Sequence, residues 1–426
     1  MRFVYVALAA VALIFLLRLT PSRLITLVGD APIVAVPVSS DPNADIEPQK
    51  PLAEPPRPIK ALYMTNWSAS SKAKTEYIFN LLETTELNAV VLDIKDYTGV
   101  VGYEPDVAAV REYGAYEKRI PKINALIKRF HDAGVFVIGR IAVFQDMALV
   151  KARPELAVQS ASSGRAWSDR KGVHWLDTAA TPVWDYNLDI ARDALARGFD
   201  EINFDYIRFP TDGDLEDIRY PYYKPELATK RQVVRQFFDH LRNQLPTAKI
   251  SADIFGEAVV NTNPTTIGQY LEDTFEAFDV VAPMIYPSHY HKNFIGLINS
   301  AAEPYPVIRY SMDRAFERFA AHRDQLLREQ AGSETPLLPA LSEFRPWIQD
   351  FNYGATYTPA MVRAQIDAVD DAARAAAGCV GVGRTTKQQQ IVREPQAPRP
   401  PCEYQEIGWL LWNASNVYSR AALLPQ

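Results

Sequence analysis

The chain has 426 residues, of which 48% are hydrophobic and 23% charged, so it can bury a large core. Its 45 Lys and Arg residues against 51 Asp and Glu residues give a formal net charge of −6. This acidic balance argues against a nucleic-acid partner, because affinity for nucleic acid depends on basic faces that neutralise phosphates. The two cysteines exclude a zinc ribbon or a cluster of thiolate ligands.

The chain begins with an uninterrupted apolar run, residues 3–17, between Arg2 and Arg18. Its length fits the apolar region of a signal peptide and falls short of the roughly 20 residues that span a bilayer. No clear small-x-small cleavage site follows. We therefore expect residues 1–20 to be either a cleaved signal peptide or a signal anchor that tethers the protein to the membrane. Both alternatives place the rest of the chain in the cell envelope, in a periplasmic or extracellular compartment.

The segment after this run is rich in proline, with eight prolines between residues 31 and 58. Such a composition is typical of an extended, semi-rigid spacer. The alternative is that residues 3–17 form a buried core helix. The proline-rich stretch argues against it, because that stretch cannot belong to the same compact element. The sequence thus predicts a linker over residues 21–59 and a folded domain over residues 60–426.

From Lys60 onward, short apolar runs alternate with amphipathic helical patterns, which is typical of βα units around a parallel sheet. One such helix is predicted to start at Pro121 and to end before Gly134. The expected strands are residues 61–67, 89–95, 135–143, 201–207, 249–255, 280–286, 337–341 and 408–413. Eight strands alternating with helices predict an α/β fold of the (β/α)₈ TIM-barrel class. An open doubly wound sheet is the alternative, but no Gly-x-Gly-x-x-Gly or Walker-type loop follows the first strand.

Polar and aromatic side chains gather at the C-terminal ends of these strands, where barrel enzymes place their chemistry. The residues expected to line one cleft and to contact a substrate are Asn66, Trp67, Asp93, Lys95, Arg140, Asn203, Arg208, Tyr286, His289, Trp347 and Trp412. This mixture suits carbohydrates, because sugar C–H faces pack on aromatic rings and sugar hydroxyls need charged or amide partners.

Asp205 is the strongest single candidate for a catalytic role. Period-two alternation places it on the same face as Asn203, and Arg208 follows closely enough to keep its carboxylate ionised. An Asp205–Arg208 pair that only holds a loop in place is the alternative. Cleavage of a glycosidic bond needs a second carboxyl group in the protonated state. Asp253 and Glu257, at the end of the next strand, are the candidates.

Six segments of the chain resemble, in order, a bacterial family of glycoside hydrolase domains. The segments are residues 88–96 (NAVVLDIKD), 204–210 (FDYIRFP), 251–256 (SADIFG), 283–290 (PMIYPSHY), 345–351 (RPWIQDF) and 408–414 (GWLLWNA). The family, formerly a domain of unknown function, is related to amylase-like barrels, so the resemblance implies a TIM barrel that cleaves a polysaccharide. It names no substrate, because the family is described by fold analogy. In the related barrels the nucleophile ends strand four, here Asp205, and the acid ends strand five or six.

The chain departs from this family at residues 380–405, a Gln- and Pro-rich insertion before the last strand. Cys379 and Cys402 bracket most of this insertion. We expect them to form a disulfide, because an exported protein folds in an oxidising compartment and both cysteines flank one loop. Closing a loop of this size stabilises a protein by roughly 3 kcal/mol in the chain-entropy estimate.

The remaining signals are weaker. His289 and His291 form an H-x-H pair with no third ligand at a matching spacing, so no metal and no cofactor are expected. The sequence predicts a glycosidase for a cell-envelope or exported polysaccharide. The alternative is a catalytically inactive barrel that binds glycan or peptidoglycan. Facing carboxyl groups about 5–10 Å apart across a water-accessible cleft favour hydrolysis, whereas an Asp205 that is buried and held by arginine favours binding alone.

Overall fold

The computed structural model describes residues 44–262, 266–329, 342–379 and 404–426. The expected signal segment 1–20 and its apolar run 3–17 lie outside these residues, as does the linker up to residue 43. Within the described ranges, no helix combines the length and the apolar character that crossing a membrane requires.

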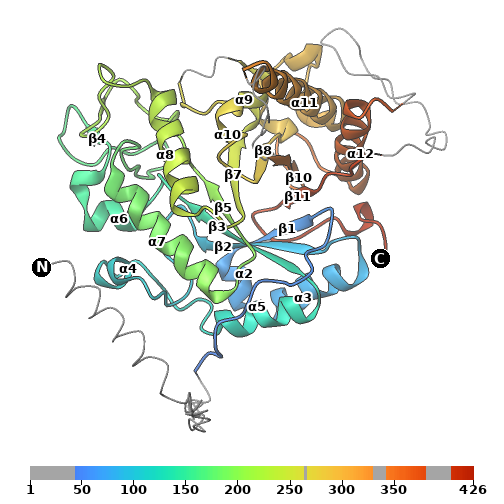
Figure 1. Cartoon of the computed structure of the whole chain (residues 1–426), viewed down its shortest axis with the longest axis horizontal. Coiled ribbons are helices and arrows are strands. Elements are labelled where there is room, and N and C mark those ends of the chain that lie inside the picture. Colours follow the sequence, from blue (N-terminus) through green and yellow to red (C-terminus); the bar gives the residue numbers. More distant parts are fainter. Residues whose placement is uncertain (1–43, 263–265, 330–341, 380–403) are drawn as a thin grey trace, which may run out of the picture. The chain divides into compact units, whose positions relative to one another are not determined.

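Eight parallel strands form a closed barrel in the described part of the domain (Figure 1). They are β1 (Lys60–Met64), β2 (Ala89–Lys95), β3 (Phe136–Ala142), β5 (Glu201–Asp205), β7 (Ile250–Phe255), β8 (Val280–Met284), β10 (Trp347–Gln349) and β11 (Trp409–Trp412). Strand β11 pairs with β1, and a bridge between Met284 and Trp347 joins β8 to β10 and closes the ring. The predicted (β/α)₈ class is confirmed.

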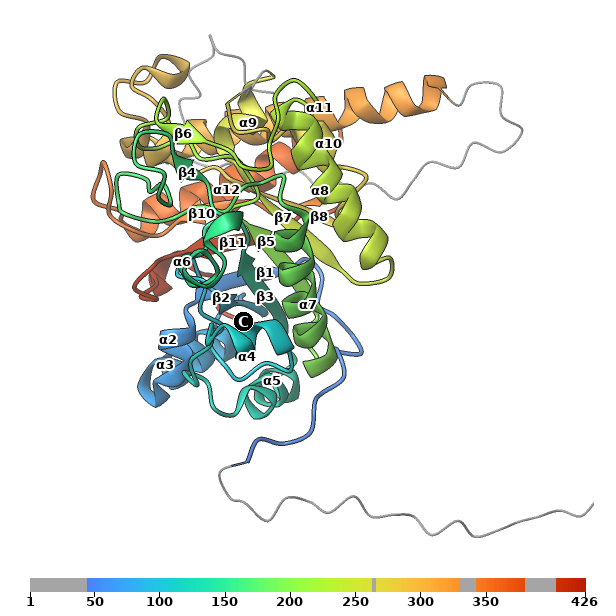
Figure 2. The same cartoon turned by 90° about the vertical axis from the view of Figure 1, so that its left-hand side faces the viewer.

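Helices cover the outside of the barrel, as Figure 2 shows for α7 and α8 on one side. The helices are α2 (Asn66–Ser70), α3 (Lys72–Thr84), α4 (Ala108–Glu112), α5 (Ile123–Asp132), α6 (Met147–Ala152), α7 (Thr181–Arg197), α8 (Lys230–Gln244), α9 (Gly256–Val260), α10 (Leu271–Thr274), α11 (Pro304–Glu329) and α12 (Pro359–Ala376). The helix expected from Pro121 is α5, and Gly134 beyond its end has φ +69°, a conformation that glycine adopts without strain. A two-stranded sheet, β4 (Gln159–Ser160) with β6 (Ile218–Arg219), lies in the loops.

The barrel strands separate two apolar layers because their side chains alternate between the two faces. Ile202 and Phe204 of β5 belong to the large layer between strands and helices. Residues of the other set, such as Val91 and Trp347, form a smaller cluster inside the barrel. The inward positions of β5 are therefore its polar ones, and this alternation directs its carboxylates into the barrel.

The seventh strand lies later in the chain than the sequence predicted. Residues 337–341 fall outside the described part, and the strand is instead formed by β9 (Glu343–Phe344) and β10, with Arg345 and Pro346 between them. Proline has no N–H to donate to a neighbouring strand, so the ladder is interrupted there. Trp347 and Gln349 accordingly lie on the strand and not in the loop that follows it.

Part of the expected linker is bound to the barrel. The Asp45 carboxylate accepts hydrogen bonds from the backbone N–H groups of Asn124 and Ala125 at the start of α5, at 2.7 and 3.1 Å. Further along, the N–H of Leu52 donates to Asp200 at 2.5 Å. The compact unit therefore begins at Asp45 and not at Lys60, and residues 45–59 are not a free spacer.

Candidate functional site

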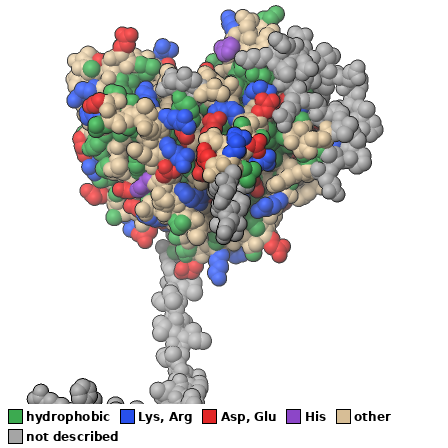
Figure 3. Space-filling view, turned by 45° about the horizontal axis from the view of Figure 1, so that its top comes forward, with side chains coloured by type: hydrophobic (Ala, Val, Ile, Leu, Met, Phe, Trp, Pro, Cys, Tyr) green, Lys and Arg blue, Asp and Glu red, His purple; other side chains and the backbone are tan. Residues whose placement is uncertain are grey.

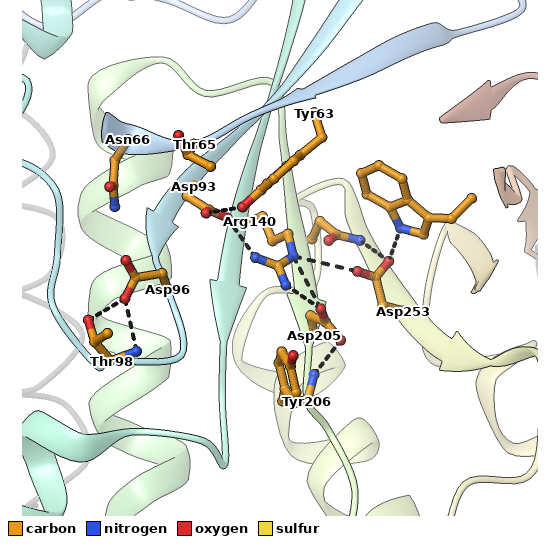
Figure 4. A network of polar contacts seen from close by, with 12 residues as sticks. Tyr63, Thr65, Asn66, Asp93, Asp96, Thr98, Arg140, Asp205, Tyr206 and Asp253 are labelled. Carbon is orange, nitrogen blue, oxygen red and sulfur yellow. Dashed lines mark hydrogen bonds and ion pairs between the residues drawn. The ribbon is translucent and has the colours of Figure 1, made fainter. Parts of the chain in front are cut away.

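One arginine and three carboxylates meet at the C-terminal ends of β2, β3, β5 and β7 (Figure 4). Arg140 donates from Nη1 to Asp93 at 2.6 Å and from Nη2 to Asp205 at 2.5 Å. Its Nε lies 3.2 Å from Asp205 Oδ2 and 3.9 Å from Asp253 Oδ2. All four side chains are buried. One positive charge thus faces three carboxyl groups.

The strand register explains why these residues meet. Arg140 of β3 lies opposite Asp93 of β2 on one side and Asn203 of β5 on the other, so its side chain reaches both neighbours. Asp205 follows Asn203 by two positions and points to the same face. Chain segments more than 100 residues apart therefore contribute to one cluster inside the barrel mouth.

Asp253 is held by neutral donors. Its Oδ1 accepts hydrogen bonds from Asn203 Nδ2 at 2.9 Å and from Trp347 Nε1 at 2.7 Å. Burial raises the pKa of Asp253 well above the usual range, and the nearby charge of Asp205 raises it further, against a partial opposing effect of Arg140. The protonated form of Asp253 is therefore favoured.

Asp93 serves to orient the arginine. The hydroxyl of Tyr63 donates to its second oxygen, and the Tyr63 ring stacks on Trp412 with ring centroids 3.9 Å apart. Burial is the main cause that raises the pKa of Asp93, and Arg140 opposes it. For Arg140, burial lowers the pKa, but Asp205 and Asp93 more than offset this, so the pKa lies above its usual value and the guanidinium stays charged.

The sequence analysis did not identify Tyr63 as a site residue, although alternation from Ala61 could have placed its side chain inside the barrel.

A cavity of about 1330 Å³ opens above this cluster. Eight of the predicted site residues line it: Arg140, Asp205, Arg208, Asp253, Glu257, Tyr286, His289 and Trp412. Lys171 and Phe351 also line it and were not predicted. The volume exceeds the roughly 300–1,000 Å³ of typical small-molecule sites and suits part of a larger ligand. On the face drawn in Figure 3, acidic and basic side chains are interspersed, without a large area of one sign.

Residues 61–376 match a family described as "Putative glycosyl hydrolase domain". The chain belongs to this family. Among curated proteins, no sequence matches it significantly.

Two solved structures, a glycoside hydrolase domain and a hypothetical protein, are similar to this chain. The glycoside hydrolase domain of PgaB (BpsB) from Bordetella bronchiseptica is 15% identical, covers 84% of this chain and 95% of its own, and superposes with a TM-score of 0.52. A hypothetical protein from Ruminiclostridium thermocellum is 39% identical over 45% of this chain and 96% of its own, with a TM-score of 0.42. At 15% identity the PgaB likeness supports the barrel fold alone.

Three predicted site residues lie beneath the cavity and not on its wall. Asp93, Asn203 and Trp347 are buried and bind the residues that do face it. They position Arg140 and Asp253, whereas the sequence had placed them in contact with the substrate.

Lys95 points away from the site that the sequence assigned to it. The pairing of β2 with β3 shifts between Asp93 and Lys95, as in a β-bulge, and this shift turns Lys95 out of the alternation. The side chain is buried, forms an ion pair with Asp146 at 2.6 Å and lies over the ring of Tyr186 on α7. It joins strand and helix outside the barrel and does not line the cavity.

Asn66 and Trp67 lie on α2, apart from the residues that line the cavity. Asn66 is buried and accepts a hydrogen bond from Arg119 at 3.0 Å. Trp67 is 60% exposed, and the guanidinium of Arg119 lies 4.2 Å from its ring centroid. Figure 4 shows Asn66 above Asp96, which also pairs with Arg119.

Arg208 is not the partner of Asp205. Its Nη1 donates to the carbonyl of Phe209 at 2.9 Å and to the Thr211 hydroxyl at 3.3 Å, and Arg140 takes the place beside Asp205. Arg140 comes from a neighbouring strand, which sequence proximity could not reveal.

The predicted disulfide lies partly outside the described residues. Cys379 is buried just beyond α12, but Cys402 and residues 380–403 of the insertion 380–405 are not described. The pairing stays a prediction.

Proposed function

We propose that this domain hydrolyses a glycosidic bond in a polysaccharide, with Asp205 as nucleophile or base and Asp253 as acid. The observation that carries the proposal is that both carboxyl groups line one cavity and approach the same Nε of Arg140. The 3.2 Å and 3.9 Å distances limit the separation of these Oδ2 atoms to about 7 Å, compatible with the roughly 5–9.5 Å of glycosidase pairs.

The two carboxyl groups have different hydrogen-bond partners. Asp205 pairs with Arg140 and accepts the N–H of Tyr206 at 2.6 Å, which suits a carboxylate. Asp253 has its pKa raised by burial and by Asp205, which suits an acid. Because two donors occupy Asp253 Oδ1, the proton belongs on Oδ2. Glu257 of α9 is exposed at the same cavity and is the other candidate acid.

The lining of the cavity supports a polysaccharide as the substrate. Aromatic side chains, including Tyr286, Phe351 and Trp412, lie beside the charged cluster, as sugar recognition requires. The expected export segment 1–20 supports the further proposal that the domain acts on a polysaccharide in the cell envelope or outside the cell. The possible tether through residues 3–17 belongs to the same proposal.

Glycan binding without cleavage is the second candidate function. It is favoured by the burial of Asp205 and by the hydrogen bonds that occupy both of its oxygens. A nucleophile held this firmly needs the substrate to displace or redirect Arg140. Asp205 nevertheless reaches the cavity wall, which keeps hydrolysis the better supported function.

A screen of the purified protein against bacterial polysaccharides tests the proposal. New reducing ends and the binding of each polymer are measured on the same samples. Hydrolysis predicts that at least one polymer gains reducing ends with time in proportion to enzyme concentration. Tight binding of a polymer with no new ends would support the binding function and contradict hydrolysis.

A further inference from the structure

Arg208 is a buried cation at the edge of the cavity that forms no salt bridge with a described carboxylate, although the charges of Asp205, Asp169 and Asp212 partly offset the lowering of its pKa by burial. It is 7% exposed, and both hydrogen bonds it makes with described residues come from Nη1. Its Nε is buried and has no hydrogen-bond partner within the described ranges. None of the ion pairs formed by described carboxylates includes it, even though Asp205 lies only three positions away. Arg208 itself lines the cavity, and its Nη2 also donates to no described residue, so the guanidinium keeps donor capacity for a ligand there.

Aromatic rings fix the orientation of this arginine. The guanidinium carbon lies 4.2 Å from the ring centroid of Phe255 and 4.7 Å from that of Trp175. Packing of this kind restricts the rotamers of a long side chain and excludes water from its faces. Burial lowers the pKa of Arg208 to about 10, so it stays charged at neutral pH. Burying an unpaired charge costs several kcal/mol, which a bound anion would offset.

Among the residues that line the cavity, the charges left on the side of Arg208 are positive, whereas Asp169 and Asp212, which also act on Arg208, are not part of the lining. Lys171 also lines the cavity, and its ammonium group has no salt-bridge partner among described residues. It lies near His289, whose pKa is lowered by burial and, to a smaller extent, by Lys171. Asp205 forms its ion pair with Arg140, and the raised pKa of Asp253 favours the neutral form of that side chain. Glu257 is the one further carboxyl group among the described residues on the wall.

We propose that Arg208, assisted by Lys171, binds the carboxylate of an acidic sugar, so that the substrate is a uronate-bearing polysaccharide. The inference rests on the proposed function and adds the charge of its substrate. A guanidinium matches a carboxylate in plane and can donate two parallel hydrogen bonds, whereas a neutral sugar hydroxyl offers no charge to compensate the buried cation. Arg208 is then a specificity residue beside Asp205 and Asp253.

The test measures binding of the full-length protein to polygalacturonate, alginate and hyaluronate, each paired with its carboxyl-reduced, neutral form. All proteins carry Asp205→Asn, so that no polymer is consumed during the measurement. At least one acidic polymer should bind ten times or more tighter than its reduced form. Adding Arg208→Gln should remove about tenfold or more of that affinity, as expected for a hydrogen bond to a charged group, and leave binding of the reduced form unchanged.

Arg170→Gln is the matched control, because Arg170 precedes Lys171, has a side chain that is 76% exposed and pairs with Asp212 outside the cavity wall. It should leave the affinity unchanged. If the Arg208→Gln protein does not fold, Lys171→Gln provides the second variant, because Lys171 is exposed. It should weaken the binding of acidic polymers and leave the binding of the reduced forms unchanged.

Three results overturn the inference: no acidic polymer binds, the reduced forms bind equally well, or the variants lose no affinity. Release of reducing ends by the wild-type protein from neutral polymers alone would also overturn it while leaving the hydrolase function intact. The expected binding pattern with no cleavage by the wild-type protein would instead contradict the hydrolase function and keep the acidic ligand.

Discussion

The two ends of β5 each direct a buried carboxylate toward an arginine, yet their surroundings differ. At the start of the strand, Glu201 binds Nη1 of Arg345 through both oxygens at 2.9 and 3.1 Å, with Lys249 at 4.0 Å. At the end of the strand, Asp205 shares Arg140 with two further carboxyl groups. The first group has one carboxylate facing two cations and lines no described cavity, whereas the second has three carboxyl groups facing one cation beneath an open cavity.

On the proposed function, this difference separates a structural ion pair at Glu201 from a reactive one at Asp205. A matched pair keeps both charges satisfied, and losing one partner leaves the other buried and uncompensated. At the C-terminal end of β5, burial is the main cause that raises the pKa of Asp253. The charge of the neighbouring Asp205, which Arg140 offsets only in part, is the second cause. Glu201 should therefore matter for stability, and Asp205 and Asp253 for reaction.

The largest expected effect is the loss of turnover when Asp253, the proposed acid, is replaced. Asp253→Asn keeps the shape and can still accept from Asn203 and Trp347, but it cannot transfer a proton. We expect kcat on a cleaved polysaccharide to fall by about 10²–10⁴-fold with a small change in KM. Glu257→Gln, on the same cavity wall, should cost much less. A larger loss for Glu257→Gln than for Asp253→Asn would assign the acid to Glu257.

A smaller effect, on stability, is expected at the other end of β5. Glu201→Gln leaves Arg345 without its counter-charge and should lower the free energy of unfolding by about 3 kcal/mol, measured in urea. Activity per folded molecule should be unchanged. Asp132→Asn breaks the exposed Lys128–Asp132 pair and serves as the control, with an expected loss below about 0.5 kcal/mol. Equal losses for the two variants would show that Glu201 is not a structural charge.

The smallest effect concerns the pH dependence of stability. Because the pKa of Asp253 is raised in the folded state, its neutral form stabilises the fold below the unfolded value of about 3.9, and this contribution is lost as pH rises toward the folded pKa. Asp253→Asn mimics the neutral form. Its free energy of unfolding relative to wild type should rise with pH from about 4 upward, and a flat difference over pH 4–8 would contradict the raised pKa.

The sequence predicted the barrel because its signal is repeated and local. Residues 89–95 are a strand with the expected bounds, and α5 ends before Gly134 as predicted. The sequence favoured residues 337–341 for the seventh strand because they are apolar, whereas the observed strand is short, contains polar residues and is interrupted at Pro346. Hydrophobic periodicity and composition therefore identified the class of fold. They did not identify the bounds of a strand where the chain departs from regular alternation.

The site was predictable only as far as strand ends and alternation reach. Asp205, Asp253 and Arg140 were found because each ends or precedes the end of a strand. The partnership of Asp205 with Arg140 depends on register across strands, and the displacement of Lys95 depends on a bulge that no local pattern shows. Which carboxyl group is protonated depends on burial and shared charge, and both are properties of the folded barrel.

The central claim is that Asp205, which pairs with Arg140 at the cavity, is the carboxylate that reacts with the substrate. The most direct measurement is the turnover of Asp205→Asn on a polysaccharide that the wild-type protein cleaves, with thermal unfolding as the check on the fold. The account predicts a loss of several orders of magnitude in kcat by a protein that is folded and still binds the polymer. Near-wild-type turnover by the folded Asp205→Asn protein would contradict it.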